Sequence, residues 1–218
     1  MTDIFKDGLL VDVNVSFWSG AKALRAEDLG LKEEDLPEAY RLGKKMLIPA
    51  EVIRKFRSIE GKARRIVEVN SFPFPIGNAR FIPKKRFVEV QEELKALQVQ
   101  YMTLVEDLVA NYEDYRNEMI PVYTQAAENA FITSSPVTHE FGPDYDRELE
   151  RNSYIERFLR RIESFYPPVD SLRSRFSLAW VVYEIALPRL RQGNAEDISK
   201  DLHAKEVIEE EYRAQVRE

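Results

Sequence analysis

The 218-residue sequence predicts an α+β fold that is mainly α-helical. Two long stretches in the middle of the chain have apolar residues at helical spacing, and two shorter stretches have the alternation or the residue types of strands. These observations predict a long antiparallel helical hairpin, coiled-coil-like, with a small antiparallel β-sheet at its base. We expect a single domain over residues 1–218, because this length suits one well-packed core. Residues 49–122 would form the hairpin arm.

The two strands of the base sheet are expected at residues 9–18 and 175–185. In the first, Val11, Val13 and Val15 alternate with polar residues, which is the period of a strand with one buried face. The second, RFSLAWVVYEI, is rich in strand formers but is apolar on nearly all sides, as a buried helix would also be. A strand is favoured because the backbone groups of the first strand need a partner.

The first helix of the hairpin is expected to begin at Pro49, because a first-turn position does not need the missing N–H. Its apolar residues are spaced alternately by four and three: Val52, Phe56, Ile59, Ala63 and Ile66. The second helix is expected at 88–120, with similar spacing and one stutter. Its apolar residues are Val90, Leu94, Leu97, Tyr101, Leu104, Leu108, Tyr112, Tyr115, Met119 and Val122. Pro121 should end or kink this helix.

The parts of the chain that flank the hairpin should also be helical in places. Residues 25–43 are expected to form only short helical turns, because two glycines and a proline interrupt them. A third helix is expected at about 144–166, where two prolines follow it. A charged amphipathic helix is expected at 195–218, with Asn194 as its cap.

The stretch 71–87, SFPFPIGNARFIPKKRF, should be an ordered, extended connector between the two hairpin helices, because its prolines and glycine forbid a continuous helix. Its four phenylalanines should be mostly packed, since that much aromatic surface left in water is unusual. They are Phe72, Phe74, Phe81 and Phe87. The basic residues at its end, Lys84, Lys85 and Arg86, should stay exposed, because no acid within the stretch can pair with them.

The composition argues against an enzyme. The chain has no cysteine, which excludes disulfides and thiolate metal sites, and it has only two histidines. It contains no phosphate-binding glycine loop, no G-x-S-x-G elbow and no H-E-x-x-H pair. A hydrolase that uses a divalent cation would have to draw on the loop that contains His139, Glu140, Asp144 and Asp146, but a solvated acidic loop before a helix is the favoured interpretation of these residues. We therefore predict no catalytic residue, no cofactor and no metal.

The start of the sequence lacks the basic residues and the long apolar run of a signal peptide. No stretch approaches the roughly 20 apolar residues that span a bilayer. We expect a cytoplasmic protein without a membrane partner and without a small-molecule substrate.

Charge is distributed unevenly along the chain. Residues 44–86 carry twelve Lys or Arg against three Glu, and residues 87–150 carry fourteen acids against three basic residues. One interpretation is a phosphate-binding surface, with Phe72, Phe74 and Phe81 stacking on bases. The other is a basic helix that neutralises an acidic helix folded against it, with the phenylalanines buried at the end of the hairpin. The candidate nucleic-acid-binding residues are Arg54, Arg57, Lys62, Arg65, Arg80, Lys84, Lys85 and Arg86.

Four stretches resemble a bacterial and phage family, domain of unknown function 3150 (DUF3150). They are VNVSFWSGAKALRAEDLGL, LGKKMLIPAEVIRKFRSIEGKARRIV, the turn ending in FIPKKRF, and EELKALQVQYMTLVEDLVANYEDYRNEM. The resemblance covers about residues 9–120 and extends more weakly to RSRFSLAWVVYEI. It implies genomic neighbours that encode MoxR-type AAA+ ATPases and von Willebrand A domain proteins similar to CobT. It defines no catalytic residues, and VNSFPFPIG departs from the family's glycine-containing turn.

Two functions of different classes follow as expectations. The first is a non-enzymatic interaction or scaffold protein, an accessory subunit or adaptor of an AAA+ ATPase-associated system, whose partners are an AAA+ ATPase or a second copy of the chain. The second is a nucleic-acid-binding helical subunit of a larger ribonucleoprotein or DNA-processing complex, which would use the basic segment 44–86. Steep salt dependence of binding would distinguish the second from the first.

Overall fold

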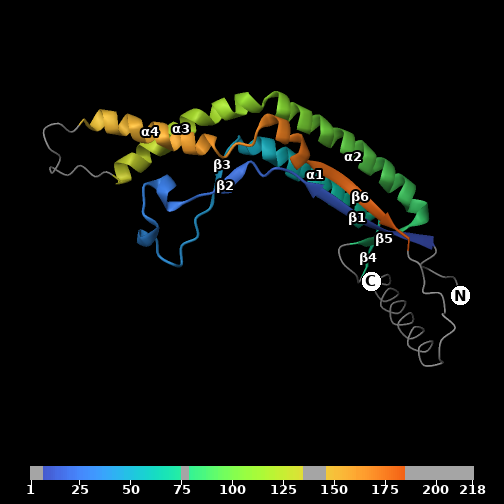
Figure 1. The fold of residues 1–218 in the computed structure, drawn as a ribbon. Helices are drawn as coiled ribbons and strands as arrows, with labels where there is room; N and C mark the ends of the chain where they lie inside the picture. The colour runs from blue at the N-terminus through green and yellow to red at the C-terminus, as the bar shows by residue number, and fades with distance from the viewer. Residues whose placement is uncertain (1–6, 75–78, 135–145, 185–218) are drawn as a thin grey trace, which may run out of the picture. The chain divides into compact units, whose positions relative to one another are not determined.

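The structure is a computed structural model that describes residues 7–74, 79–134 and 146–184 (Figure 1). The chain groups into two compact units, the first from residues 1–16, 57–103 and 177–218, and the second from 17–56 and 104–176. Two helices, α1 (Ala50–Val69) and α2 (Lys84–Ala110), each continue from one unit into the other. That the whole chain forms a single domain stays a prediction. No helix in the described ranges is both long enough and apolar enough to cross a membrane.

The first unit contains a four-stranded antiparallel sheet in the order β4–β5–β1–β6. Its strands are β1 (Gly8–Ser16), β4 (Phe72–Pro73), β5 (Arg80–Pro83) and β6 (Ser177–Tyr183). The register pairs Leu10 with Tyr183 and Ser16 with Ser177. The predicted α+β class is therefore confirmed, as is the antiparallel pairing of a strand near 9–18 with one near 175–185. Residues 177–183 form a strand and not a buried helix.

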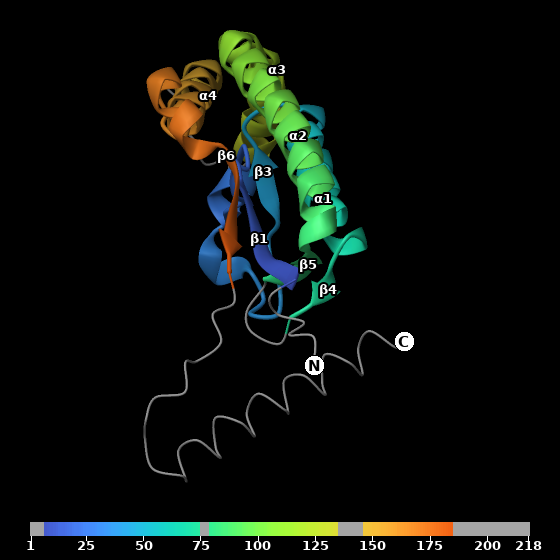
Figure 2. The same cartoon turned by 90° about the vertical axis from the view of Figure 1, so that its right-hand side faces the viewer.

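One face of this sheet is packed against the helices of the same unit. Val11 and Val15 on β1 stand opposite Val182 and Leu178 on β6. The side-chain amide of Gln98 in α2 donates to the carbonyl of Leu178 at 2.8 Å. Figure 2 shows α1 and α2 on the same side of the sheet, with the chain leaving α1 toward β4 and returning along α2.

The connector at 71–87 is more regular than an extended linker. It contains the β4–β5 pair, and α2 already begins at Lys84, directly after a proline whose fixed backbone suits the approach to a helix. Phe81 is 3% exposed, with its ring packed over the backbone of Gly8, where a Cβ atom would lie 1.9 Å from the ring. Phe72, Phe74 and Phe87 are half-buried. The packing of the phenylalanines is thus complete only at Phe81.

The second unit combines a two-stranded sheet with two packed helices. The strands β2 (Ala21–Ala23) and β3 (Lys44–Met46) pair antiparallel, and short 3₁₀ turns lie between them, in agreement with the predicted helical turns. The helices α3 (Tyr112–Ser134) and α4 (Arg147–Glu163) pack on each other. Gly30 has a φ of +72°, and a Cβ there would lie 2.1 Å from the carbonyl oxygen of Ala130, so this close approach requires glycine.

The predicted second hairpin helix, 88–120, needs correction at both ends. It begins four residues earlier, and it is interrupted at Asn111 and not at Pro121, which lies inside α3 on the exposed face. The side chain of Asn111 donates to the carbonyl of Asp107 at 2.8 Å, in competition with the backbone bond to that carbonyl.

The buried stripe of α2 and α3 also differs from the predicted seam. It repeats every eleven residues, through Val90, Leu94, Leu97, Tyr101, Val105, Leu108, Tyr112, Tyr123, Ala127 and Ala130. Val105 and Tyr123 are buried where Leu104 and Val122 were predicted. The reason is geometric, because an eleven-residue repeat has 3.67 residues per turn and drifts less per residue around a straight helix than a heptad repeat does. Beyond Tyr101 the predicted seam is therefore correct at Leu108 and Tyr112 and wrong at Leu104 and Val122, while Tyr115 and Met119 are only half-buried.

Four buried or half-buried tyrosines fasten these elements by donating their hydroxyl to a backbone carbonyl. The pairs are Tyr101 to Ser16, Tyr112 to Pro167, Tyr123 to Met46 and Tyr166 to Leu47. The first three tyrosines are the repeating positions of the eleven-residue stripe. Burial raises the pKa of Tyr101 and of Tyr112 to about 12. A buried neutral phenol that has a carbonyl acceptor resists ionisation.

We expect the free energy of unfolding to fall as the pH rises from about 10 to about 12. The pKa of Tyr101 is higher in the folded chain than the ordinary value of 10.0, so its stabilising contribution is complete below pH 10 and is lost as the pH passes through about 12. Urea unfolding at a series of alkaline pH values should show a smaller decline for Tyr101→Phe, with a loss of about 1 kcal/mol at neutral pH. Exposed Tyr40→Phe should keep the wild-type decline. Stability that stays flat up to pH 12 would contradict this account.

Candidate functional site

The exposed side of α1 carries the largest group of predicted site residues that lie together in the structure. The helix buries four of the five predicted seam residues, with Val67 buried where the half-buried Ile66 was expected. The opposite side carries six exposed cations, which we call the α1 basic face: Arg54, Lys55, Arg57, Lys62, Arg64 and Arg65. Because the apolar stripe is fixed against the core, these cations point to solvent.

Most of the α1 basic face has no acidic partner among the residues that the structure describes. Arg54 pairs with Glu51 at 3.9 Å and Arg64 with Glu60 at 2.8 Å, both within α1. The other four cations form no ion pair with any described residue. Likewise, within the part of the chain that the structure describes, no ion pair joins α1 to the acidic residues of α2. The interpretation that the acidic helix neutralises the basic one is therefore not what the structure contains.

The remaining predicted residues lie on β5 and on the first turn of α2. Arg80 is half-buried, and its Nε donates to Ser71 at 2.7 Å. Lys84, Lys85 and Arg86 are exposed as predicted, and Arg86 pairs with Glu89 at 3.2 Å. The first turn of α2 contains no acid. Cations are disfavoured there by the helix dipole, at a cost of roughly 0.3–1 kcal/mol each.

An open groove of about 650 Å³ in the first unit brings Arg64 of α1 together with Arg80 of β5. Asp12 of β1 and Glu68 of α1 also line it. Two carboxylates beside two guanidinium groups leave the groove without net charge, so it is not an anion site by itself. The buried Phe81 cannot stack on a base, which removes one of the three predicted stacking residues.

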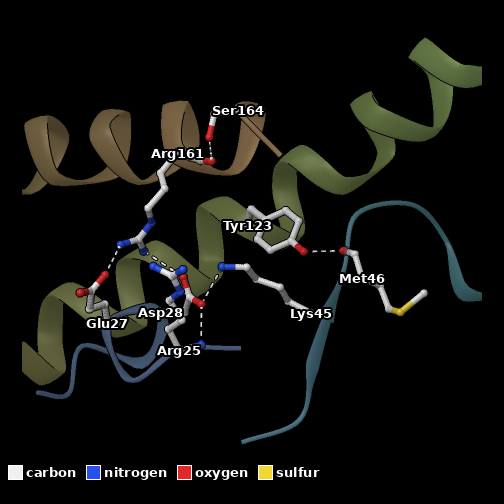
Figure 3. Close-up of polar contacts among 8 residues, drawn as sticks. All are labelled: Arg25, Glu27, Asp28, Lys45, Met46, Tyr123, Arg161 and Ser164. Carbon is white, nitrogen blue, oxygen red and sulfur yellow. Dashed lines mark hydrogen bonds and ion pairs between the residues drawn. The ribbon is translucent and has the colours of Figure 1, made fainter. Parts of the chain in front are cut away.

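The second unit contains a buried cluster of charges that the sequence did not predict (Figure 3). The carboxylate of Asp28 accepts hydrogen bonds from the backbone N–H of Arg25 at 2.9 Å, from Lys45 at 2.6 Å and from Arg161 at 2.9 Å. Arg161 also pairs with Glu27 at 3.0 Å. Asp28 and Lys45 are only 5% and 7% exposed. The cluster joins a 3₁₀ turn, a short strand and α4.

The charges of this cluster cancel, and aromatic rings complete its surroundings. The Lys45 ammonium lies 4.7 Å from the centre of the Phe165 ring, and the Arg161 guanidinium lies 5.1 Å from that of Phe158. Buried charges are tolerated only when they are paired and hydrogen-bonded in this way. The cluster is therefore a charge-neutral link between the 3₁₀ turn, β3 and α4 of this unit. Its members lie far apart in the sequence, so no spacing pattern could have indicated it.

We expect Asp28→Asn to lower the free energy of unfolding by about 3–5 kcal/mol, because it leaves the buried Lys45 without a counter-charge, whereas Arg161 keeps its pair with Glu27. The matched control is Glu156→Gln, which breaks the exposed pair with Arg160 and should cost about 0–1 kcal/mol. Urea unfolding followed by circular dichroism measures both. Equal losses for the two variants would mean that the buried pairs contribute no more than a surface pair.

The residues considered for a divalent cation do not form a site in the described chain. His139, Glu140 and Asp144 lie outside the described residues, as does the helix expected at 195–218. Asp146 caps α4, where its carboxylate accepts from the backbone N–H groups of Glu148 and Leu149 at 3.0 and 3.1 Å. Within residues 7–74, 79–134 and 146–184 there is no group of three or more potential metal ligands.

Comparison with protein-family models gives one match, to the family described as "Protein of unknown function (DUF3150)", over residues 5–210. This match covers nearly the whole chain. Comparisons with curated proteins and with solved structures give no match.

Proposed function

The chain belongs to the DUF3150 family, and on that basis we propose that it is a non-enzymatic interaction protein, an accessory subunit or adaptor of an AAA+ ATPase-associated bacterial or phage system. The AAA+ partner follows from the genomic neighbours that the resemblance implies. The observation that supports a binding role is the α1 basic face, a row of exposed cations of which four have no ion pair within the described residues. Surface charge without an internal partner is available for an anionic surface of another molecule.

A tagged copy of the full chain, purified from its native host, should bring down an AAA+ ATPase, and the two purified proteins should bind each other. A variant with Arg57, Lys62 and Arg65 all changed to Glu should bind at least tenfold more weakly if the α1 basic face is the contact. Mass spectrometry identifies the partner, and calorimetry with the purified pair measures the affinity. The adaptor proposal fails if no AAA+ protein is recovered, or if the purified pair does not bind.

A second candidate function is binding to nucleic acid. It is supported by the exposed cations of the α1 basic face and by their spacing along the helix. Arg54 and Arg65 lie eleven residues apart and so project from the same side of α1. A row of cations along one helix face can follow a phosphate backbone, and such binding releases counterions and does not depend on base sequence. The exposed Lys84 and Lys85 would extend this surface. With Phe81 buried, phosphate contacts rather than base stacking would supply the affinity.

The binding of a mixed-sequence oligonucleotide, single-stranded and double-stranded, should weaken steeply between about 50 and about 200 mM salt. The triple variant Arg57→Glu, Lys62→Glu, Arg65→Glu should lower the slope of log K against log salt by about 2–3, since it removes three phosphate contacts. A charge-matched control changes three exposed cations of the second unit, Lys32, Arg41 and Lys44, to Glu.

The control should bind like the wild type apart from a small general loss, because it has the same net charge as the triple variant. If both variants lose binding equally, binding depends only on the net charge of the protein, and the α1 basic face is not a nucleic-acid-binding site. No binding by the wild type at about 50 mM salt rejects nucleic acid as a partner.

A further inference from the structure

The strand β6 forms an open edge of the sheet in the first unit. In the order β4–β5–β1–β6 it pairs with β1 on one side only, and no strand of the described residues covers its other side. Figure 1 shows β6 alongside β1 over the length of their pairing. Edge strands of natural sheets are normally protected by charged residues, proline, bulges or short length, because their free N–H and C=O groups attract other strands.

The sequence of β6 contains none of the usual protective residues. Its seven residues, SLAWVVY, include no charge, no proline and no glycine. Its last three residues are large and apolar or aromatic and are substantially exposed: Val181 at 50%, Val182 at 38% and Tyr183 at 48%. Strand formers of this kind, exposed at an unpaired edge, mark a place where another strand adds to the sheet.

We propose that β6 pairs antiparallel with β6 of a second copy of this chain, about a two-fold axis at Trp180. In this register Ala179 stands opposite the partner's Val181, Leu178 opposite the partner's Val182, and Ser177 opposite the partner's Tyr183. The first residues of the strand are small or buried and the last are large and exposed. Antiparallel pairing therefore places the exposed Val181 and Tyr183 beside the smaller Ala179 and Ser177, and the exposed Val182 beside the buried Leu178.

Charge complementarity supports a second copy as the occupant. The strand itself is uncharged, so two copies meet without like-charge repulsion along the paired residues. Arg175 precedes the strand and Glu184 follows it, and both are exposed. Antiparallel pairing brings the start of one strand near the end of the other, and so brings Arg175 near the partner's Glu184. An isologous interface of this kind is self-complementary and closes at two subunits.

The strength of the association is limited by its size. One seven-residue strand pair buries less surface than the roughly 1,200–2,000 Å² of a standard stable interface. We therefore expect a reversible dimer with a dissociation constant in the micromolar range and not an obligate one. This inference does not rest on the proposed function, because it concerns a different surface from the α1 basic face and is measured without nucleic acid or an ATPase.

Sedimentation velocity of the full chain over a hundredfold range of concentration should show a monomer–dimer equilibrium. Val181→Lys should weaken dimerisation at least tenfold, because it places a cation at the paired edge. The fold should tolerate this change, since Val181 is half-exposed and stands opposite Asp12 on β1. The matched control is Val99→Lys, at an exposed apolar position of α2 in the same unit, which should dimerise like the wild type.

Cross-linking tests the register, and the chain suits it because it has no cysteine of its own. A mixture of the Ala179→Cys and Val181→Cys proteins should form disulfide-linked heterodimers faster than either protein alone, since facing Cα atoms in an antiparallel pair are about 4.5–5.5 Å apart. Val99→Cys should not cross-link with either. A wild type that stays monomeric at every concentration, or cross-linking of Val99→Cys at the same rate as the mixture, overturns the proposal.

Discussion

The eleven-residue register of buried positions along α2 and α3 is the constraint on which both compact units depend. It places Tyr101, Tyr112 and Tyr123 at equivalent positions of successive repeats. Each donates its hydroxyl to a backbone carbonyl of its own unit: Tyr101 to the end of β1 in the first, Tyr112 and Tyr123 to connecting segments in the second. A shift of one residue would turn the helix by about 100° and remove these hydroxyls from their acceptors. Within the first unit the register thus fixes the end of β1, and within the second unit it fixes the two connecting segments.

One segment of the second unit is held in place mainly by buried ion pairs and not by buried apolar side chains. The segment between β2 and β3 is short of buried apolar side chains, with Ala26 as its one fully buried apolar residue. Asp28 in this segment is instead fixed by Lys45 and Arg161. Low dielectric strengthens these bonds and also makes any unpaired member costly, so the arrangement selects one position for the segment more than it adds net stability.

The features that could be predicted from the sequence are those with a local period. The alternation in β1, the run of strand formers in β6 and the seam of α1 each occupy a few consecutive turns or residues, and the outward direction of Arg57, Lys62 and Arg65 follows from the seam alone. The burial of Val105 in place of Leu104 could not be predicted, because a heptad and an eleven-residue repeat agree over their first four positions.

Features that depend on distant residues left no signal in the sequence. Asp28 and Lys45 are 17 residues apart, and Asp28 and Arg161 are 133 residues apart, and each by itself resembles a solvated surface residue. The strands β2 and β3 have three residues each, too few to show a period. The sequence allowed two roles for Phe81, stacking on a base or packing in the interior. Only the position of its ring over Gly8 in the structure distinguishes them.

The exposed cations of α1 and α2 are difficult to explain by stability alone. Like charges three or four residues apart on a helix, such as Arg54 with Arg57 and Lys62 with Arg65, destabilise it by about 0.2–0.5 kcal/mol per pair. The three cations at the start of α2 also oppose the helix dipole. Acids of α2 that would relieve this repulsion form no ion pair with α1 within the described residues. The repulsion therefore lowers the stability of α1 in the isolated chain, and an anionic partner bound along α1 would relieve it.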